Sequence, residues 1–525
     1  MFKEEFHRWV FLVGLGLLLA GLPLSLYLMS VSQLMLSVNW LLEGRFRKKW
    51  HSFRAQPEAG IFLLIFLLHV IWLWNTRDFD YALKDLRTKL PLLALPIILA
   101  TAKPVSRGTL KHLLLVYVAA VLFGSFRSTA IWLTQEVSDV REISVYISHI
   151  RFSLNVCMAI FILIWMSLPE GADLRPWKRM AYGIAALWLV GFLFILQSMT
   201  GLVVFLLTSV ILLLRHASRE PSLKLRRLVF LVATVLPLLV LVYIAVLVAR
   251  FARIDKVDFS RLEKATPRGE MYHHDTLNCQ TVNGHYVWIY IADNELRESW
   301  NQRSELDYDG LDRQGHQLRD ILIRYLTSEG LRKDADGVAS LSDDEIDRIE
   351  SGWANADCDG RNVIKSRICE ILWEYRNYRC TGDPSGHSVL MRYEYWKTSV
   401  FLIQHHFWTG VGTGDMNVAF QQAYETLDSR LREEWRFRSH NQFLSIFVAF
   451  GLFGFLVFLF AFLYPLVKGG KPFSGFLLTA FISIALLSMI TEDTIESQAG
   501  VTFVALFYCL LRFLREENSS PTKRE

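Results

Sequence analysis

The grouping of the apolar residues constrains this chain more than any other feature. Of its 525 residues, 52% are hydrophobic. They are concentrated in runs of about 17 to 25 residues, the length of a helix that crosses roughly 30 Å of hydrocarbon. This pattern predicts an all-α polytopic membrane protein. The first run begins near Trp9 and is not followed by a small-residue cleavage site, so we expect a retained span rather than a cleaved signal peptide.

The apolar runs outline about twelve candidate spans. The second and fourth are short, and the seventh and eighth run together through LQSMTG. Their approximate limits are residues 9–27, 28–43, 59–76, 89–102, 112–134, 150–168, 179–197, 199–215, 228–249, 441–467, 474–491 and 499–515.

Basic residues in the short loops predict the topology. Loops rich in Lys and Arg alternate with less basic loops, and by the positive-inside rule this places both termini in the cytoplasm. Residues 76–89 depart from the alternation, because they carry four basic side chains on the predicted outer side. The basic loops are 44–54, 103–111, 173–179, 215–227 and 468–471, together with the C-terminal tail, whereas 135–142 is net acidic and 491–498 has no Lys or Arg.

This topology divides the chain into four predicted regions. They are an N-terminal transmembrane bundle of about nine helices (1–249), an outer loop domain (250–440), C-terminal transmembrane helices (441–515) and a cytoplasmic tail (516–525).

The loop domain is expected to be mostly helical, because two stretches repeat apolar residues at helical spacing. Between them lies a DxDG sequence followed by a later Glu. It has two interpretations: a calcium loop, or a turn followed by a helix that Ser342 and Glu345 cap together. We expect the turn and the capped helix. The two stripes are Leu318, Ile321, Leu322 and Tyr325, and Ile368, Ile371, Leu372 and Tyr375.

The loop domain also holds four of the six cysteines. In an oxidising compartment they would form up to two disulfides, and the sequence leaves the pairing open. No pair has CxxC spacing, so we expect no metal site. Cys157 and Cys509 lie in predicted spans and are expected to pack as small hydrophobic residues. The four loop cysteines are Cys279, Cys358, Cys369 and Cys380.

Polar side chains at the mouths of spans each admit two interpretations, because charge in or near hydrocarbon is costly. Arg151, with His149 and Asn155 close in sequence, is either an arginine that snorkels to lipid headgroups or an inward-facing anion site. His440 precedes Asn441 and Gln442 at the head of a span. The three are either a polar helix start or functional groups.

Further candidates lie in loops and in one amphipathic helix. The glycines of GVGTGD, residues 410–415, would turn N–H groups toward an anion or simply form a turn. Glu492, Asp493 and Glu496 lie in the shortest predicted outer loop, where a solvated turn is the simpler interpretation. Gly451 and Gly454 suit close helix packing. The helix before GVGTGD is expected to have its apolar side at Tyr395, Trp396, Ser399, Val400 and Ile403.

Together these segments resemble the O-antigen ligase and O-antigen polymerase superfamily. The resemblance rests on an arginine at a span mouth, a long outer loop, then RxxxW, GVGTG, HNQFL and GLFG between Arg392 and Leu466, and finally TEDT with a later Gln. It extends to HIRFSL, DLRTKLPLL and EDTIESQAGVTF. One departure is Met199, which stands where many members carry an arginine.

The resemblance implies a membrane glycosyltransferase of GT-C-like architecture that acts without a metal or cofactor. The donor would be a glycan on undecaprenyl diphosphate, and the acceptor a lipid A–core hydroxyl at the periplasmic face of the bacterial inner membrane. Direct displacement would invert the anomeric centre. No nucleic-acid partner is expected.

The resemblance also implies which residues act. Arginines Arg151 and Arg392 would hold the diphosphate, and His440 would act on the acceptor hydroxyl. The expected substrate-binding residues are Asn441, Gln442, His149, Gly412, Gly414, Asp415, Glu492 and Asp493.

Other functions stay open from the sequence. The nearest is a polymerase of the same family that joins repeat units, and a ligase that transfers glycans to proteins is another. A glycolipid exporter, of a different class, would use the arginines for binding alone. The absence of a recognisable inverted repeat argues against it.

Overall fold

The computed structural model describes residues 2–135, 140–168, 175–251, 253–358, 363–468 and 474–514. The described chain is mostly helical and forms two compact units, each assembled from separate stretches of sequence. The first unit is Met1–Ala233, Tyr395–Ser429 and Arg436–Glu525, and the second is Thr234–Glu394 and Arg430–Trp435. The predicted cytoplasmic tail, 516–525, and parts of the predicted loops 135–142, 173–179 and 468–471 lie outside the described residues.

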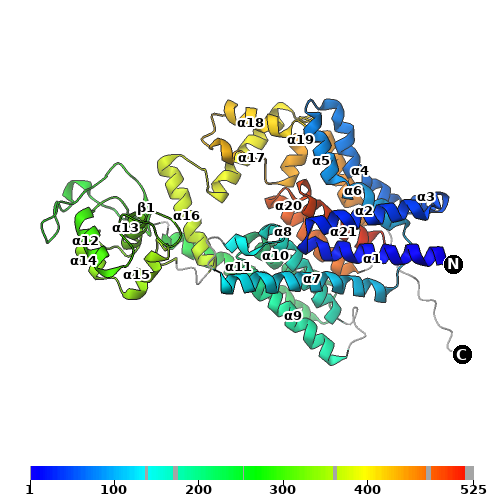
Figure 1. Cartoon of the computed structure of the whole chain (residues 1–525), viewed down its shortest axis with the longest axis horizontal. Coiled ribbons are helices and arrows are strands. Elements are labelled where there is room, and N and C mark those ends of the chain that lie inside the picture. Colours follow the sequence, from blue (N-terminus) through cyan, green and yellow to red (C-terminus); the bar gives the residue numbers. More distant parts are fainter. Residues whose placement is uncertain are drawn as a thin grey trace. The chain divides into compact units, whose positions relative to one another are not determined.

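The first unit is a bundle of helices (Figure 1). They are α1 (Phe2–Leu24), α2 (Leu26–Glu43), α3 (Phe46–Arg54), α4 (Pro57–Ile71), α5 (Phe79–Lys89), α6 (Pro91–Thr101), α7 (Arg107–Thr134), α8 (His149–Ser167), α9 (Pro176–Ile195), α10 (Met199–Arg219), α18 (Met416–Thr426), α19 (Gln442–Lys468), α20 (Gly475–Thr491) and α21 (Gln498–Arg512). Helix α1 packs along α2 and α7, α4 along α19, and α21 along α6. Two more, α11 (Leu223–Phe251) and α17 (Ser388–His405), contribute residues to both units.

Local sequence sets where several of these helices begin. Ser25 caps α2 by accepting a hydrogen bond from the N–H of Leu28 at 3.1 Å, so a long apolar stretch becomes two helices. Pro57, Pro91 and Pro176 occupy the first turns of α4, α6 and α9. A missing N–H is harmless there, because the first N–H groups of a helix have no intrahelical partner.

Eight helices of the described chain are long and apolar enough to cross a membrane, by length and composition. They coincide with eight of the predicted spans, including the first. The other predicted spans form α2, α6, α20 and α21. Helix α6 has 11 residues, which extend about 17 Å and are too few to cross a bilayer. The predicted membrane-protein class is therefore supported, whereas the number of about twelve spans is not confirmed.

The second unit has its own hydrophobic core. Its elements are β1 (Thr281–Val282), β2 (His285–Tyr286), α12 (Asp293–Arg303), α13 (Leu318–Ser328), α14 (Ala335–Ala339), α15 (Asp343–Glu350) and α16 (Val363–Thr381). The two strands pair antiparallel, with Thr281 opposite Tyr286. The apolar stripe predicted for α13 is confirmed, because all four of its residues are buried. The stripe predicted for α16 is only partly buried, since Ile368 is buried and Tyr375 is 49% exposed.

The predicted cap in the second unit is confirmed. Ser342 and Glu345 form a capping box at the start of α15. Asp334, in the DxDG sequence, caps α14 by accepting a hydrogen bond from the N–H of Gly337 at 2.9 Å. Both acidic segments therefore begin helices.

The cysteine pairing that the sequence left open is given by the structure. Two disulfides join Cys279 to Cys380 and Cys358 to Cys369, and all four residues belong to the second unit. The other two cysteines are buried in α8 and α21, as expected.

The apolar side predicted for α17 is only partly buried. Tyr395 and Ser399 are buried, but Trp396 and Val400 are 37% and 47% exposed. In a membrane protein an apolar side chain need not be covered by protein, because lipid is an apolar solvent as well.

Candidate functional site

A cavity of about 450 Å³ lies in the first unit, where four separate stretches of sequence meet. They are the start of α8, helix α18, the segment before α19, and the loop between α20 and α21. Three arginines, one histidine and three carboxylates line it: Arg151, Arg436, Arg438, His440, Glu492, Asp493 and Glu496. The cavity thus brings together Arg151, His440 and the two acidic residues of the predicted site.

His440 is held by contacts to its backbone and its ring. Its φ of 45° lies in the left-handed region, which few non-glycine residues adopt. Its N–H donates to Asp493 Oδ2 at 3.1 Å, and its Nδ1 lies 3.6 Å from Glu492 Oε2. The ring of Tyr395 stacks on the imidazole with centroids 5.4 Å apart. These contacts orient the ring through Nδ1 and one face, and none of them uses Nε2.

Arg151 has one hydrogen-bonding group in use and one open. Its Nη2 donates to the carbonyl oxygen of Asp493 at 3.0 Å. Its Nη1 is buried and has no hydrogen-bond partner among the residues that the structure describes. A buried N–H of a charged group without an acceptor is costly. This arrangement therefore suits a ligand that brings oxygen acceptors into the cavity.

Asp493 connects Arg151 and His440. Besides the two contacts above, its Oδ1 accepts a hydrogen bond from Ser445 Oγ at 2.6 Å. Burial raises the pKa of Asp493, which makes its hydrogen-bond donors important for keeping it ionised. The loop between α20 and α21 is therefore not the solvated turn that the simpler interpretation predicted.

Arg438 and Glu496 of the cavity lining also belong to a network of four charged side chains, with Asp85 and Lys89. Lys89 pairs with Asp85 and also donates to Glu496 Oε2 at 2.8 Å. Arg438 Nη1 lies 3.3 Å from the same Glu496 oxygen. Burial opposes the ionisation of Glu496, but Lys89 and Arg438 outweigh it and lower the pKa of this carboxyl. Burial raises the pKa of Asp85 to about 6, against the opposing effect of Lys89.

Asn441 and Gln442 make their hydrogen bonds within the protein. Asn441 Oδ1 accepts from the N–H groups of Phe443 at 3.0 Å and Leu444 at 3.2 Å, as an N-cap residue does. The buried Gln442 accepts from Ile495 N at 2.8 Å, and its Nε2 donates to Glu496 at 3.1 Å. We propose that both residues position the loop beside His440 rather than bind sugar.

The glycines of GVGTGD pack against other backbone segments. The N–H of Gly412 donates to Ala449 O at 2.9 Å, and that of Gly414 donates to Thr76 Oγ1 at 3.2 Å. A Cβ on Gly412 would overlap the carbonyl of Asn75. These N–H groups are engaged by the protein, so we propose a packing role for this segment rather than anion binding.

Asp415 ends that segment, and its side chain has a structural role. Its carboxylate accepts hydrogen bonds from the N–H of Arg77 at 3.0 Å and of Asp78 at 2.8 Å, just before α5. This fixes the start of the helix that carries Asp85 and Lys89. Asp415 does not line the cavity.

Two predicted site residues lie outside the cavity lining. His149 begins α8 but does not line the cavity. Arg392 belongs to the second unit, and its Nη1 lies 3.4 Å from Ser388 O on the same helix. The substrate roles of both residues stay predictions.

No role was predicted for Lys89 or Arg438, and a solvated turn was the simpler interpretation for Glu496. Two signals pointed to them. Residues 76–89 broke the alternation of basic loops, and burial of Lys89 explains part of that exception, because a buried lysine forms an ion pair instead of marking a cytoplasmic loop. Arg438 stands two residues before His440 at the same span mouth.

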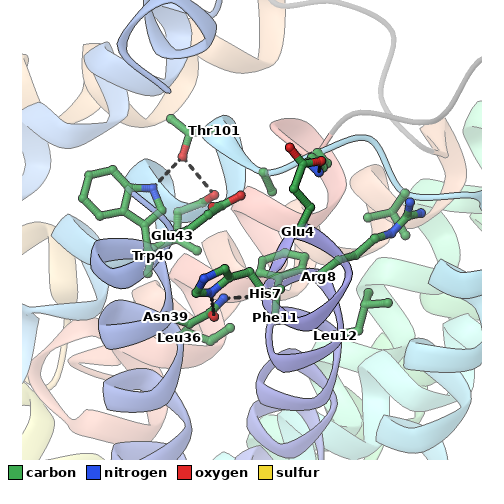
Figure 2. Close-up of a pocket in the computed structure, with 14 residues that line it drawn as sticks. Glu4, His7, Arg8, Phe11, Leu12, Leu36, Asn39, Trp40, Glu43 and Thr101 are labelled. Carbon is green, nitrogen blue, oxygen red and sulfur yellow. Dashed lines mark hydrogen bonds and ion pairs between the residues drawn. The ribbon is translucent and has the colours of Figure 1, made fainter. Parts of the chain in front are cut away.

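A second cavity of the first unit, shown in Figure 2, is lined by none of the predicted site residues. There His7 on α1 and Asn39 on α2 lie side by side, with Nδ1 and Oδ1 2.8 Å apart. Trp40 Nε1 donates to Thr101 Oγ1 at 2.8 Å. These polar contacts join α1 to α2 and α2 to α6, so they serve helix packing.

Comparison with known proteins gives one family. Residues 354–459 match a family described as O-antigen ligase. The matched stretch contains α17, α18, His440 and the first part of α19. It confirms the resemblance that the order of the motifs predicted. No curated protein matches the chain.

Proposed function

We propose that this chain, a relative of the O-antigen ligases, is a membrane glycosyltransferase that moves a glycan from undecaprenyl diphosphate to a lipid A–core hydroxyl. The observation that carries the proposal is the open Nη1 of Arg151, buried in the cavity that His440 and Glu492 also line. A cavity that holds a cation with an open N–H and an oriented imidazole suits the transfer of a glycan from an anionic leaving group to a hydroxyl.

On the donor side, arginines would hold the diphosphate. As the bond from the sugar C1 to the diphosphate oxygen breaks, negative charge grows on that oxygen. Arg151 and Arg438 are then in place to stabilise it, since guanidinium groups bind phosphate oxygens through two N–H groups. Glu496 balances Arg438 in the free protein, and Arg151 has an unpaired N–H for a phosphate oxygen.

On the acceptor side, His440 would act as the general base. Glu492, 3.6 Å from Nδ1, keeps that nitrogen protonated, which leaves Nε2 to take the proton of the acceptor hydroxyl. The acceptor oxygen then forms its bond to C1 as the diphosphate leaves. A direct displacement of this kind inverts C1.

The site belongs to one end of the helix bundle. Contacts join α5, the segment before α19, the loop between α20 and α21, and the head of α8. This supports the topology in which all four lie on the side opposite the termini. We propose that this side is the periplasmic face of the inner membrane.

The test is the surface glycolipid profile of a strain that lacks this chain, complemented with wild type or with His440→Ala. The wild type should restore glycan on lipid A–core. His440→Ala should leave the polymer on the undecaprenyl carrier, with transfer reduced at least 10²-fold. His405→Ala, an exposed histidine of α17, is the matched control and should behave as wild type.

Other outcomes separate the alternatives. Lipid A–core that carries only single repeat units in the deletion strain would identify a polymerase. Full transfer by His440→Ala, at normal protein level, would overturn the proposed chemistry and would favour an exporter.

A further inference from the structure

The second unit contains a cavity of about 480 Å³ that the proposed chemistry does not use. It is lined by α13 and α16, by the turn after β1 and by the segment 352–358. All of these lie within the second unit (Figure 1). Its lining includes two tryptophans, two arginines, one glutamate and three amide side chains: Trp353, Trp373, Arg324, Arg376, Glu370, Asn283, Asn355 and Gln314.

Arg324 is the group in this cavity that most clearly lacks a partner. It extends from α13 over the ring of Trp373, with its guanidinium carbon 4.3 Å from the ring centroid. Its Nε is buried and has no hydrogen-bond partner in the described part of the chain. Burial lowers the pKa of Arg324 to about 10. A buried cation with an open N–H is stabilised by an anionic oxygen acceptor.

The amide side chains around the cavity are held in fixed orientations. Asn355 Nδ2 donates to Asn283 Oδ1 at 3.0 Å, and Asn283 Nδ2 lies 3.2 Å from Asn355 Oδ1. Gln314 Nε2 donates to Ser351 O at 2.7 Å. These hydrogen bonds fix the walls of the cavity, so a ligand meets a preformed surface.

A disulfide fixes two walls of the cavity to each other. Cys358 and Cys369 line it, and their bond ties the segment that carries Trp353 and Asn355 to helix α16. Trp353 and Trp373 are therefore held on linked walls. A rigid, partly aromatic cavity with few polar groups is typical of a preformed ligand site.

We propose that this cavity is a subsite for an acidic sugar residue of a glycan, whose carboxylate or phosphate pairs with Arg324 and whose ring packs against Trp353. The inference rests on the proposed function, because it places a second segment of the glycan substrate on the protein. It assigns Arg324 to the acidic group and the aromatic surface to the apolar face of the ring, while the amides hold the walls that carry them.

The test is binding of an acidic oligosaccharide to the full chain in detergent micelles. Trigalacturonate is the probe and maltotriose, neutral and of equal length, is the control, both followed by saturation-transfer NMR. The acidic probe should bind at least tenfold more tightly than the neutral one. Equal binding of the two probes, or no binding of either, would overturn the proposal.

Two variants test whether trigalacturonate binds in this cavity. Arg324→Gln should weaken binding of trigalacturonate at least tenfold, whereas Arg261→Gln, an exposed arginine of the same unit, should leave it unchanged. Wild-type affinity in Arg324→Gln would overturn the assignment. Since Arg324→Gln could also misfold, amide hydrogen exchange of the wild-type chain gives a second measurement. The acidic probe should slow exchange in residues 314–324 and 352–376, and protection confined to other segments would overturn the proposal.

The same experiment separates this inference from the proposed function. His440→Ala should bind trigalacturonate as the wild type does. Binding that depends on Arg324 in a chain without transfer activity would keep the subsite and reject the transferase. Transfer by a wild-type chain that binds neither probe would keep the transferase and reject the subsite.

Discussion

Arg151 and Lys89 show two ways in which this chain keeps a buried cation. Lys89 is fully satisfied, because Asp85 and Glu496 both contact its ammonium group. Arg151 is only half satisfied, with Nη2 bonded to Asp493 and Nη1 open. A paired buried charge supports the fold, whereas an unpaired one is costly and indicates a ligand. We therefore assign Lys89 to positioning and Arg151 to the substrate.

The first prediction at this scale concerns the shape of the Arg151 cation. Arg151→Lys keeps the charge but loses the second N–H group that would hold a phosphate oxygen. Transfer should fall by about 10²–10³-fold, measured with purified protein and lipid-linked donor. Arg127→Lys, an exposed arginine of α7, is the control and should keep wild-type activity. Normal transfer by Arg151→Lys would show that Arg151 is only a lipid anchor.

A second residue prediction concerns the buried charge network. Glu496→Gln leaves Lys89 and Arg438 without their shared carboxylate, so the free energy of unfolding should fall by about 3–5 kcal/mol. Thermal unfolding in detergent, followed by tryptophan fluorescence, measures it. Glu425→Gln, at an exposed glutamate of α18, should change stability by less than about 0.5 kcal/mol.

The pH dependence of stability in the wild type and in Glu496→Gln tests whether the charge of Glu496 causes the stabilisation. The pKa of Glu496 is lowered in the folded protein, so its ionised form stabilises the fold above the unfolded pKa of about 4.3. That contribution is lost as the pH falls through the lower folded pKa. The wild type should lose this stability below about pH 4.3, and Glu496→Gln should lack that part of the loss. Parallel pH profiles would contradict the assignment.

At the scale of elements, α19, which follows His440, is broken in its interior. Gly451 has φ 63° and ψ −168°, so the helix is interrupted there. From the sequence, Gly451 was expected to serve close helix packing. The structure corrects this: the N–H of Leu452 donates to Phe407 O at 2.8 Å, and that of Val411 donates to Val448 O at 2.9 Å. The segment before α18 thus satisfies the backbone of the break, as a broken membrane helix requires.

This contact gives an element-scale prediction. Gly412 has φ +101°, and a Cβ there would overlap the carbonyl of Asn75. Gly412→Ala should therefore cost about 2–5 kcal/mol in strain and overpacking, measured by thermal unfolding and by yield of monodisperse protein. Gly183→Ala is the control, because Gly183 lies in α9 with no heavy atom within 4 Å of an added Cβ. It should be neutral or slightly stabilising. A stable Gly412→Ala protein would contradict the packing role.

At the scale of the whole molecule, the two units are stabilised differently. The first unit is a helix bundle with many apolar side chains exposed, as on α9, where 17% of the apolar stretch is buried inside the protein. The second unit has a compact core around Trp300, Tyr308 and Leu322, together with both disulfides. The bundle depends on an apolar solvent, and the second unit on a water-excluding core and covalent links.

The prediction at this scale uses reduction. Dithiothreitol should destabilise the second unit by about 2–5 kcal/mol per disulfide, because both bonds lie there. Limited proteolysis under reducing conditions should cut first within 255–390, while the helices of the first unit stay intact. Blocking of the two buried cysteines, Cys157 and Cys509, serves as the control and should not change this pattern. Simultaneous loss of both units would contradict independent stabilisation.

The sequence by itself determined the helical membrane class, the family resemblance and the candidates Arg151 and His440. These features can be read locally, because an apolar run of span length predicts a membrane helix. A polar group within or beside such a run is also informative, because charge in hydrocarbon is costly. The caps at Ser342 and the stripe of α13 were predictable for the same reason, since their partners lie within a few residues.

Only the tertiary structure decided which polar residues share a cavity. Arg438 and Glu496 are far in sequence from the Asp85–Lys89 pair of α5, and no local pattern distinguishes a lysine paired in the interior from one that marks a loop. Likewise the sequence allowed an anion-binding loop or a turn at Gly412 and a helix interface at Gly451. In the structure the N–H of Gly412 is bonded to Ala449, and neighbouring backbone fills the space beside both glycines. Hydrogen-bond partners distant in the chain fix these roles, and folding alone brings such partners together.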